Sequence, residues 1–375
     1  MIPFAITAPG RILFGRGEAP KAPAIIHAFG ARGVIVHGAS AARAAWLVDA
    51  LGPEVLALPC AGEPKLDDLL AALLAVKGFR PDWVAALGGG AALDMGKALA
   101  ALIPAPDGPM QHLEVVGKGL PLVAAPLPFI TIPTTSGTGA EVTRNAVIGL
   151  PEHGRKVSLR DDRMVARVAI VDPALTDGCP WPVTLASGLD AVTQVIEPFL
   201  SVKGTPYTDA LTRPSIGPGL AALQRLMVDE DADARDRLAW VSLCGGLALS
   251  NGGLGAVHGL AGVIGGMTGA AHGAICGALL GPVLAANLAA AEGAAQQRLV
   301  EVCGILAGVL GCSAAAAPGE LQDWARGAGL PGLATLGVRP DQHAEIVTAS
   351  LSASSMQGNP VPLDPGTLRR VLETS

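Results

Sequence analysis

The segment Val84–Lys97, VAALGGGAALDMGK, decides the fold class of this 375-residue chain. A short apolar run at 84–87 is followed by three glycines at 88–90, and a helical pattern continues through Lys97. Glycines that join a strand to a helix let a phosphate approach the backbone, and the helix N-terminus supplies N–H donors. The G-x-G-x-x-G and P-loop patterns are absent, because Leu93 and Ala91 stand where those patterns need glycine. Two interpretations therefore stay open, a phosphate-binding turn and a closely packed structural turn.

Similar apolar runs recur along the first half of the chain and alternate with helical segments. We expect strands at 11–15, 34–37, 55–58, 84–87, 129–132 and 168–171, and helices at 43–51, 66–76 and 90–101. This alternation predicts an α/β domain with a parallel, doubly wound sheet. Ligands of such sheets bind beyond the carboxyl ends of the strands, so the residues that follow each run are the functional candidates.

The second half of the chain changes character near Trp181 and reads as helices joined by glycine and proline. We therefore expect an α/β domain at 1–178 and an all-α domain at 179–375. Residues 238–291 contain no Asp, Glu, Lys or Arg, which by length alone would permit membrane spans. Repeated glycines, two histidines and the lack of flanking basic clusters favour buried helices instead.

The composition excludes several classes of protein. Half of the residues are hydrophobic and 15% are charged, which excludes extensive disorder. The net charge is −6 and no basic stripe is interleaved with aromatic residues, so we expect no nucleic-acid partner. The six scattered cysteines form no CxxC pair and are expected to be reduced. The N-terminal residues lack the pattern of a secretion signal, so we expect a cytoplasmic protein with no membrane partner.

A second candidate loop, Pro133–Val142, also follows a predicted strand. It offers four hydroxyl groups and two glycines, which suit contacts with phosphate or ribose. The alternative is a structural helix cap formed by Ser136 or Thr138. Two such loops on neighbouring strand ends favour a ligand-binding role for both.

A third candidate site combines a carboxylate, an amide and two histidines. Asp190 and Gln194 are four residues apart, so a helix places both side chains on one face. His258 and His272 lie in the long uncharged stretch, where a buried imidazole needs a polar partner. Either histidine alone is most simply a hydrogen-bonded core residue. Together the four side chains offer nitrogen and oxygen ligands for a divalent metal.

The set of motifs resembles the iron-containing (group III) alcohol dehydrogenase family. The resemblance covers nearly the whole chain and is carried by GGGAALDMGKA (88–98), PTTSGTGAEVT (133–143), GRKVSLRDDRMVARVAIVDPALT (154–176), DAVTQVIEP (190–198), GAVHGLAG (255–262), AHGAICGALL (271–280) and GNPVPL (358–363). It implies a dinucleotide-binding N-terminal domain, a helical C-terminal domain, a nicotinamide cofactor and a divalent metal, Fe²⁺ or Zn²⁺.

The resemblance also implies roles for individual residues. The cofactor would be bound by Gly88, Gly89, Gly90 and Asp94 at the pyrophosphate, by Thr134, Thr135 and Thr138 on the adenosine and phosphate side, and by Lys156 at the nicotinamide ribose. The metal would be held by Asp190, Gln194, His258 and His272, of which Asp190, His258 and His272 are the expected catalytic residues.

Two departures from the family pattern bear on function. Gln194 stands where the family usually has histidine, and a neutral amide oxygen is the weaker ligand. Maleylacetate reductases are relatives that can work without a metal, so a metal-independent reductase is an open alternative. Gly38 and Ser40 follow the strand at 34–37, where an acidic residue would bind the ribose 2′-hydroxyl and repel a 2′-phosphate. Because Gly38 removes that repulsion, we expect NADP(H) in preference to NAD(H).

The sequence thus predicts an NAD(P)-dependent alcohol dehydrogenase or aldehyde reductase. It would transfer hydride reversibly between nicotinamide and a small alcohol, aldehyde or ketone polarised by a divalent metal. A lyase similar to dehydroquinate synthase is the second alternative, disfavoured by the few basic residues between 180 and 300. The resemblance also implies a homodimer or a higher homo-oligomer.

Overall fold

The computed structural model describes residues 3–375 and contains two compact units. One unit comprises Thr7–Thr135 and Gly139–Asp177. The other comprises Gly178–Ser375, together with Ser136–Thr138 and the N-terminal segment that ends at Ile6. The sequence alone assigned these last two segments to the α/β half. Each unit is described by itself.

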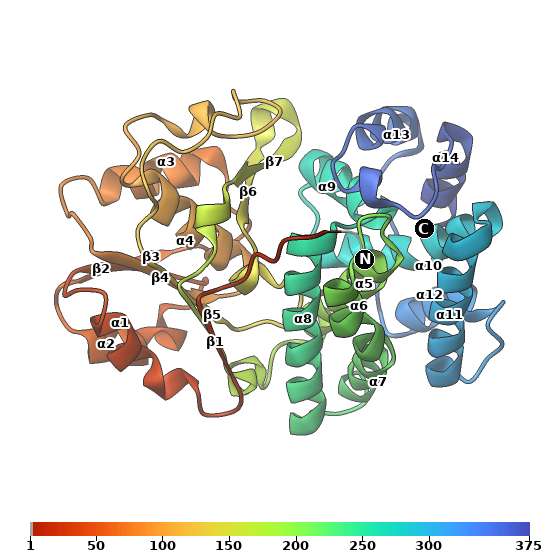
Figure 1. The fold of residues 1–375 in the computed structure, drawn as a ribbon, viewed down its shortest axis with the longest axis horizontal. Helices are drawn as coiled ribbons and strands as arrows, with labels where there is room; N and C mark the ends of the chain where they lie inside the picture. The colour runs from red at the N-terminus through yellow and green to blue at the C-terminus, as the bar shows by residue number, and fades with distance from the viewer. Residues whose placement is uncertain (1–2) are drawn as a thin grey trace. The chain divides into compact units, whose positions relative to one another are not determined.

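The first unit is built on a parallel sheet of six strands in the order β1-β8-β5-β4-β2-β3 (Figure 1). The strands are β1 (Arg11–Phe14), β2 (Gly33–His37), β3 (Val55–Pro59), β4 (Trp83–Gly88), β5 (Phe129–Pro133) and β8 (Val168–Val171). The helices are α1 (Ala22–His27), α2 (Ala45–Leu51), α3 (Leu66–Ala75) and α4 (Gly90–Leu102). The doubly wound parallel sheet predicted from the alternating apolar runs is confirmed.

Side chains of the central strands alternate between two cores, one on each face of the sheet. On β4, Val84 and Ala86 pack with residues of α3 and α4, whereas Trp83, Ala85 and Leu87 pack with residues of α1 and α2. Successive residues of a strand point to opposite faces. Because both faces are covered by helices, these strands are mostly apolar rather than alternately polar, which explains the nearly continuous apolar runs in the sequence.

The carboxyl ends of β2, β4 and β5 lie side by side in the sheet. Gly38 N–H donates to Leu87 O at 3.3 Å, and Thr134 N–H donates to Gly88 O at 3.0 Å. After β2 the chain continues outward to β3, and after β4 it continues to the opposite side through β5. The strand order therefore reverses between β2 and β4, which is where doubly wound sheets bind their ligands.

A two-stranded antiparallel hairpin accompanies this sheet and was not predicted. It consists of β6 (Asn145–Leu150) and β7 (Arg155–Arg160), which turn through Pro151–His153 and Gly154. Gly154 has φ +56°, in the left-handed region that favours glycine. On β7 the buried Val157 and Leu159 form the apolar face of the hairpin, and Lys156, Ser158 and Arg160 alternate with them.

The second unit is helical. Its helices are α5 (Trp181–Leu200), α6 (Pro206–Thr212), α7 (Ile216–Leu226), α8 (Ala232–Gly252), α9 (Ala256–Thr268), α10 (His272–Ala290), α11 (Gly293–Leu310), α12 (Ala317–Gly327), α13 (His343–Leu351) and α14 (Pro365–Thr374). Residues of α5, α7, α8, α9, α10 and α11 contribute to one continuous apolar core. The mostly helical C-terminal region predicted from the sequence is confirmed.

Glycines let α5 pack unusually close to its neighbours α8 and α10. A Cβ atom at Gly273 would lie 2.4 Å from Ala186 O, and one at Gly277 would lie 2.7 Å from a methyl group of Leu189. A Cβ atom at Gly245 of α8 would lie 2.9 Å from the Cβ of Gln194. Any larger side chain would push these helices apart, so the glycines fix the separation of the helices that carry the candidate site.

Helix α10 is long and apolar enough to cross a membrane, and α8 with α9 would pass the same test as one strongly bent pair. Two thirds of the apolar window of α10, 67%, is buried against the rest of the protein. Core helices of this kind meet the same criteria of length and hydropathy. The apolar stretch at 238–291 thus supplies packed core helices, as expected.

Candidate metal centre and cofactor-binding residues

Helix α5 carries Asp190 and Gln194 one turn apart, and both side chains are buried. Gln194 Nε2 donates to Gly137 O at 3.2 Å, while its Oε1 is buried without a hydrogen-bond partner. Asp190 Oδ1 is also buried and makes no hydrogen bond. Buried oxygen acceptors are rarely left unpaired, so two such atoms one helical turn apart fit a site that binds a cation.

His258 lies in the first turn of α9 and is oriented by a carboxylate. Its Nδ1 is 2.7 Å from Glu197 Oε2, and the other carboxylate oxygen, Oε1, accepts from Val257 N–H at 2.7 Å. Since Glu197 is an acceptor on both sides, His258 carries a proton on Nδ1. In the neutral imidazole the lone pair then lies on Nε2, which faces Asp190.

The N-terminus of α9 is held by side chains from distant parts of the chain. Ala256 N–H donates to Asn359 Oδ1 at 3.0 Å, and Asn359 in turn exchanges hydrogen bonds with the amide of Asn287. A Cβ atom at Gly255 would lie 2.8 Å from Glu197 Oε1 and 3.0 Å from Asn359 Oδ1. Glu197 and Asn359 thus accept the N–H groups that a helix start leaves unsatisfied, and they fix the position of His258.

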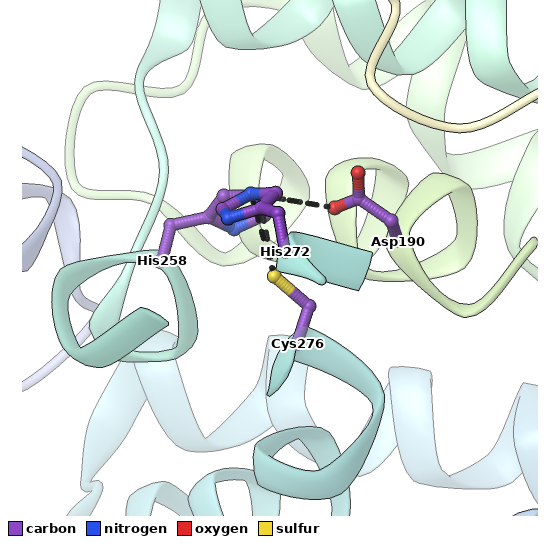
Figure 2. Close-up of side chains that lie close together, drawn as sticks. All are labelled: Asp190, His258, His272 and Cys276. Atoms are coloured by element: carbon purple, nitrogen blue, oxygen red, sulfur yellow. Dashed lines mark hydrogen bonds and ion pairs between the residues drawn. The ribbon is translucent and has the colours of Figure 1, made fainter. Parts of the chain in front are cut away.

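His272 is the first residue of α10, and Cys276 follows one turn later on the same helix. Figure 2 shows the side chains of Asp190, His258, His272 and Cys276 pointing toward one another. One ligand atom from each residue lies within 4.8 Å of all the others. The rings of His258 and His272 are tilted, with centroids 5.3 Å apart.

The charges within this cluster stabilise the ionised forms of Asp190, His258 and His272. Burial alone would raise the pKa of Asp190, but the neighbouring His258 and His272 lower it. Burial would lower the pKa of His272, yet the neighbouring Cys276 and Asp190 raise that pKa to about 9. Burial opposes charge on His258 as well, and Cys276, Asp190 and Glu197 raise its pKa well above the usual value. The carboxylates therefore attract positive charge to this point, which fits a site for a divalent cation.

The expected pyrophosphate residues lie where β4 passes into α4. Gly89 is the N-cap residue of α4 and has no side chain to cap the helix. A Cβ atom at Gly88 would lie 2.7 Å from the Cβ of Ala92, and one at Gly89 would lie 3.2 Å from Thr135 Oγ1. A side chain at either position would therefore crowd its neighbours. Its backbone and the start of α4 fit the binding of a phosphate.

Asp94, on the same helix, has a role that the sequence did not suggest. Its Oδ2 accepts from Val147 N–H at 3.1 Å, which ties β6 to α4. Lys97 Nζ, fully buried one turn later, donates to Ala140 O, Thr143 Oγ1 and Asn145 O at 2.7–2.8 Å. These contacts hold the hairpin and the end of the threonine-rich loop against α4.

The remaining expected cofactor residues are distributed as follows. Thr134 and Thr135 follow β5 in the α/β unit, whereas Thr138 lies in the short segment that packs with the helical unit. The turn after this loop, Ala140–Val142, is capped by Gly139 and not by a side chain, so neither Ser136 nor Thr138 acts as its cap.

Lys156 on β7 forms an ion pair with Glu63. Gly38 and Ser40 directly follow β2, and a Cβ atom at Gly38 would meet no atom within 4 Å.

Sequence reasoning missed Cys276 and Glu197 as members of the site. Both could have been found by spacing, because Cys276 is four residues after His272 and Glu197 is seven after Asp190. Residues four or seven apart share one face of a helix. Asn359 offered no such signal, since it reaches α9 from a segment about 100 residues away in sequence.

Comparison with known proteins gives the same family in both halves of the chain. Residues 9–173 match the family described as "Iron-containing alcohol dehydrogenase". Residues 184–375 match "Fe-containing alcohol dehydrogenase family, C-terminal". The probable alcohol dehydrogenase EutG of Escherichia coli (strain K12) is 37% identical over 205 residues, which are 54% of this chain and 51% of that protein. The 4-hydroxybutyrate dehydrogenase of Cupriavidus necator is 34% identical over 185 residues, 49% of this chain and 48% of that protein. The chain thus matches about half the length of these curated relatives.

Solved structures resemble the chain over almost its whole length. The alcohol dehydrogenase from Oenococcus oeni has a TM-score of 0.89 at 23% identity and covers 99% of both chains. The sulfoacetaldehyde reductase from Bifidobacterium kashiwanohense, solved in complex with NAD+, has a TM-score of 0.85 at 26% identity and covers 100% of this chain and 98% of that one. With both halves matched and the fold shared, this chain belongs to the iron-containing alcohol dehydrogenase family.

Proposed function

We propose that the protein is an NAD(P)-dependent alcohol dehydrogenase or aldehyde reductase that uses a divalent metal. The observation that carries this proposal is the cluster of the buried Asp190 and His258 with the partly exposed His272, whose ligand atoms converge on one point. The chain's membership of an alcohol and aldehyde oxidoreductase family supports this proposal.

The metal would be held by Asp190, His258 and His272, with the unpaired Oε1 of Gln194 as a further oxygen donor. When bound, it supplies Lewis acidity to the oxygen of the substrate, and the nicotinamide supplies or accepts the hydride. Glu197 keeps the Nδ1 proton of His258 in place, so that Nε2 stays available as a ligand. Burial of Asp190 and His258 excludes water from these ligands and strengthens their interaction with a cation.

The cofactor would bind at the carboxyl ends of β2, β4 and β5. The start of α4 and Gly88, Gly89 and Gly90 receive the pyrophosphate, and Thr134 and Thr135 lie beside this turn. Support for NADP(H) comes from Gly38, which brings no negative charge to the end of β2, and from the exposed hydroxyl of Ser40 and guanidinium of Arg43 beside it. An acidic residue at the end of β2 would instead favour NAD(H).

The lyase alternative is disfavoured by the basic residues of the helical unit. A lyase that binds phosphate and carboxylate groups needs cations available to its substrate. Four arginines of this region are instead engaged by carboxylates of the same unit, in the pairs Arg213–Glu301, Arg225–Asp231, Arg235–Glu230 and Arg298–Asp209. Their charge is therefore used for the structure of the helical unit.

The test is elemental analysis of anaerobically purified protein, combined with oxidation of NADPH and NADH in the presence of a panel of aldehydes, before and after chelation. We expect about one equivalent of iron or zinc, and loss of activity on chelation that the metal restores. Full activity without metal would exclude metal dependence and move the protein to the maleylacetate reductase type. If the protein binds NADPH or NADH but oxidises neither with any aldehyde of the panel, the proposed reductase function is wrong.

A further inference from the structure

The candidate metal centre contains a sulfur atom that the expected ligand set leaves out. Cys276 is fully buried, and its Sγ lies 3.6 Å from His272 Nε2 and 3.9 Å from His258 Nε2 (Figure 2). No other cysteine takes part in such a cluster in the described part of the chain. We propose that Cys276 is a direct thiolate ligand of the metal, together with Asp190, His258 and His272. The inference rests on the proposed function and specifies its ligand set.

The distances between the donor atoms match a four-coordinate ion. Asp190 Oδ1 lies 3.3 Å from His258 Nε2 and 3.9 Å from His272 Nε2. Tetrahedral zinc has bonds of about 2.0–2.3 Å, which place neighbouring ligand atoms about 3.3–3.6 Å apart. The oxygen–nitrogen and sulfur–nitrogen separations are 3.3–3.9 Å, and all four donor atoms lie within 4.8 Å of one another. The four atoms therefore surround a common point, and movements of up to about 1 Å bring them to tetrahedral positions.

The packing of α10 against α5 places the sulfur at this point. His272 and Cys276 are one turn apart and share the face of α10 that contacts α5. Gly273 and Gly277, each one residue further along, allow that face to approach Ala186 and Leu189 without side chains between the helices. The same close approach brings Asp190 within reach of both residues. The sulfur is thus positioned by backbone packing and not by a flexible loop.

The unpaired oxygen of Asp190 is an independent sign that the cluster binds a ligand. This carboxylate is 1% exposed, and its Oδ1 has no hydrogen bond although it faces both histidines. An apolar core would not retain such an atom without a partner. A cation at the common centre of the four groups would be coordinated by Oδ1, both Nε2 atoms and Sγ at once.

In this arrangement Gln194 supports the ligands from outside the metal's coordination sphere. Its Nε2 donates to Gly137 O, which holds the amide one helical turn from Asp190. Replacement of the amide by a thiolate as the fourth ligand changes the formal charge of the ligand set from −1 to −2. A softer and more negative set favours zinc over magnesium or manganese. Zinc can expand to five-coordination to admit a substrate oxygen.

Cobalt substitution tests the ligand directly, without reliance on activity. Metal-free protein would be loaded with one equivalent of Co²⁺, and the near-ultraviolet spectrum would be recorded for the sulfur-to-cobalt charge-transfer band. We expect the band in the unmodified chain and in the control Cys303→Ser, which changes another buried cysteine in α11. We expect no band in Cys276→Ser and Cys276→Ala, and a loss of cobalt affinity of more than the about 10–100-fold typical of outer-shell changes.

The outcomes separate the two proposals. Stoichiometric cobalt with visible d–d bands but no charge-transfer band in the unmodified chain would overturn thiolate ligation and leave the metal-dependent function standing. Unchanged affinity in Cys276→Ala would do the same. If the unmodified chain binds neither cobalt nor zinc, the metal-dependent function fails as well. Gln194→Ala tests the position of the amide. A retained charge-transfer band with a modest loss of cobalt affinity supports a place for Gln194 outside the coordination sphere. A loss of affinity as large as that of Cys276→Ala contradicts it.

Discussion

Glu197 Oε2 lies 2.7 Å from His258 Nδ1, and the same α5 helix carries the metal-binding candidate Asp190. One helix therefore supplies both a candidate ligand and the carboxylate that orients a second candidate ligand. The other oxygen of Glu197 accepts Val257 N–H, so the position of α9 and the orientation of its histidine depend on one side chain. Carboxylate, imidazole and metal in series are a common arrangement, in which the carboxylate fixes the tautomer and raises the basicity of the ligand.

We predict that Glu197→Gln lowers the affinity for zinc by about 10–100-fold, the range typical of outer-shell partners. The amide can accept a hydrogen bond from His258 with its oxygen, but its NH₂ group would then face Val257 N–H, donor against donor. The measurement is zinc affinity by competition with a chromophoric chelator. Glu345→Gln, an exposed change on α13, is the matched control. Equal affinities of Glu197→Gln and the unmodified chain would contradict the orienting role.

Removal of one histidine ligand should abolish both metal retention and activity. In His258→Ala, Nε2 is lost from the cluster, and the buried carboxylates Asp190 and Glu197 lose their common partner. The measurements are the metal content after gel filtration and the rate of aldehyde reduction. His343→Ala removes another buried histidine outside the cluster and should keep the metal. Full metal content and activity in His258→Ala would reject His258 as a ligand.

Cofactor choice is tested at the end of β2. Gly38→Asp has space for its side chain, because a Cβ atom at this position meets no atom within 4 Å. A carboxylate there would repel a 2′-phosphate, so we expect binding of NADPH to weaken about tenfold or more relative to binding of NADH. The measurement is the dissociation constant of each cofactor by nucleotide fluorescence. Gly108→Asp, also with open space, controls for the added charge. Equal effects on both cofactors would reject this placement of the adenosine ribose.

The buried pair Glu141 and Lys97 predicts how stability depends on pH in the α/β unit. Burial raises the pKa of Glu141 from 4.5 to about 7 and lowers that of Lys97 from 10.5 to about 8. Between pH 4.5 and 7 the folded state holds a proton on Glu141 that the unfolded state has released. Stability from this group is therefore present below pH 4.5 and is lost as the pH rises to about 7, by up to about 3 kcal/mol.

Glu141→Gln should remove that dependence. Its melting temperature relative to the unmodified chain should rise between pH 5 and pH 8, because the glutamine carries no charge to bury. Glu152→Gln, an exposed change in the same unit, should show no such trend. The measurement is the thermal midpoint of both variants across this pH range. A constant difference between Glu141→Gln and the unmodified chain would show that Glu141 is not the group responsible.

The fold could be predicted because short apolar segments of the sequence mark the individual strands. The strands β2, β4 and β5 are apolar on both faces, and each is followed by glycine or hydroxyl residues, so their positions and their functional ends follow from the sequence. The hairpin β6–β7 was missed although Ala146, Ile148 and Leu150 alternate with less buried residues. Charged residues at 155, 156 and 160 obscure the matching alternation of Val157 and Leu159 on the second strand.

The site was predictable only in part, because it depends on how helices pack. The histidines and Asp190 follow from motifs, and their convergence requires the contact between α5 and α10. That contact depends on Gly273 and Gly277, whose role cannot be inferred without knowing which helix lies opposite. Cys276 stood in the sequence at helical spacing from His272, but a buried cysteine in an apolar helix is usually inert. Its proximity to both Nε2 atoms distinguishes it.

The hydrogen bonds that join Asn359 to Ala256 N–H and to Asn287 have a consequence for the order in which the helical unit forms. All candidate ligands emerge from the ribosome well before residue 359, yet Ala256 N–H, at the start of α9, lacks its acceptor until Asn359 has been synthesised. The first turn of α9, which carries His258, is therefore fully capped only after residue 359 has been added to the chain. A chain truncated before Asn359 would contain every candidate ligand and yet hold the first turn of α9, with His258, less firmly.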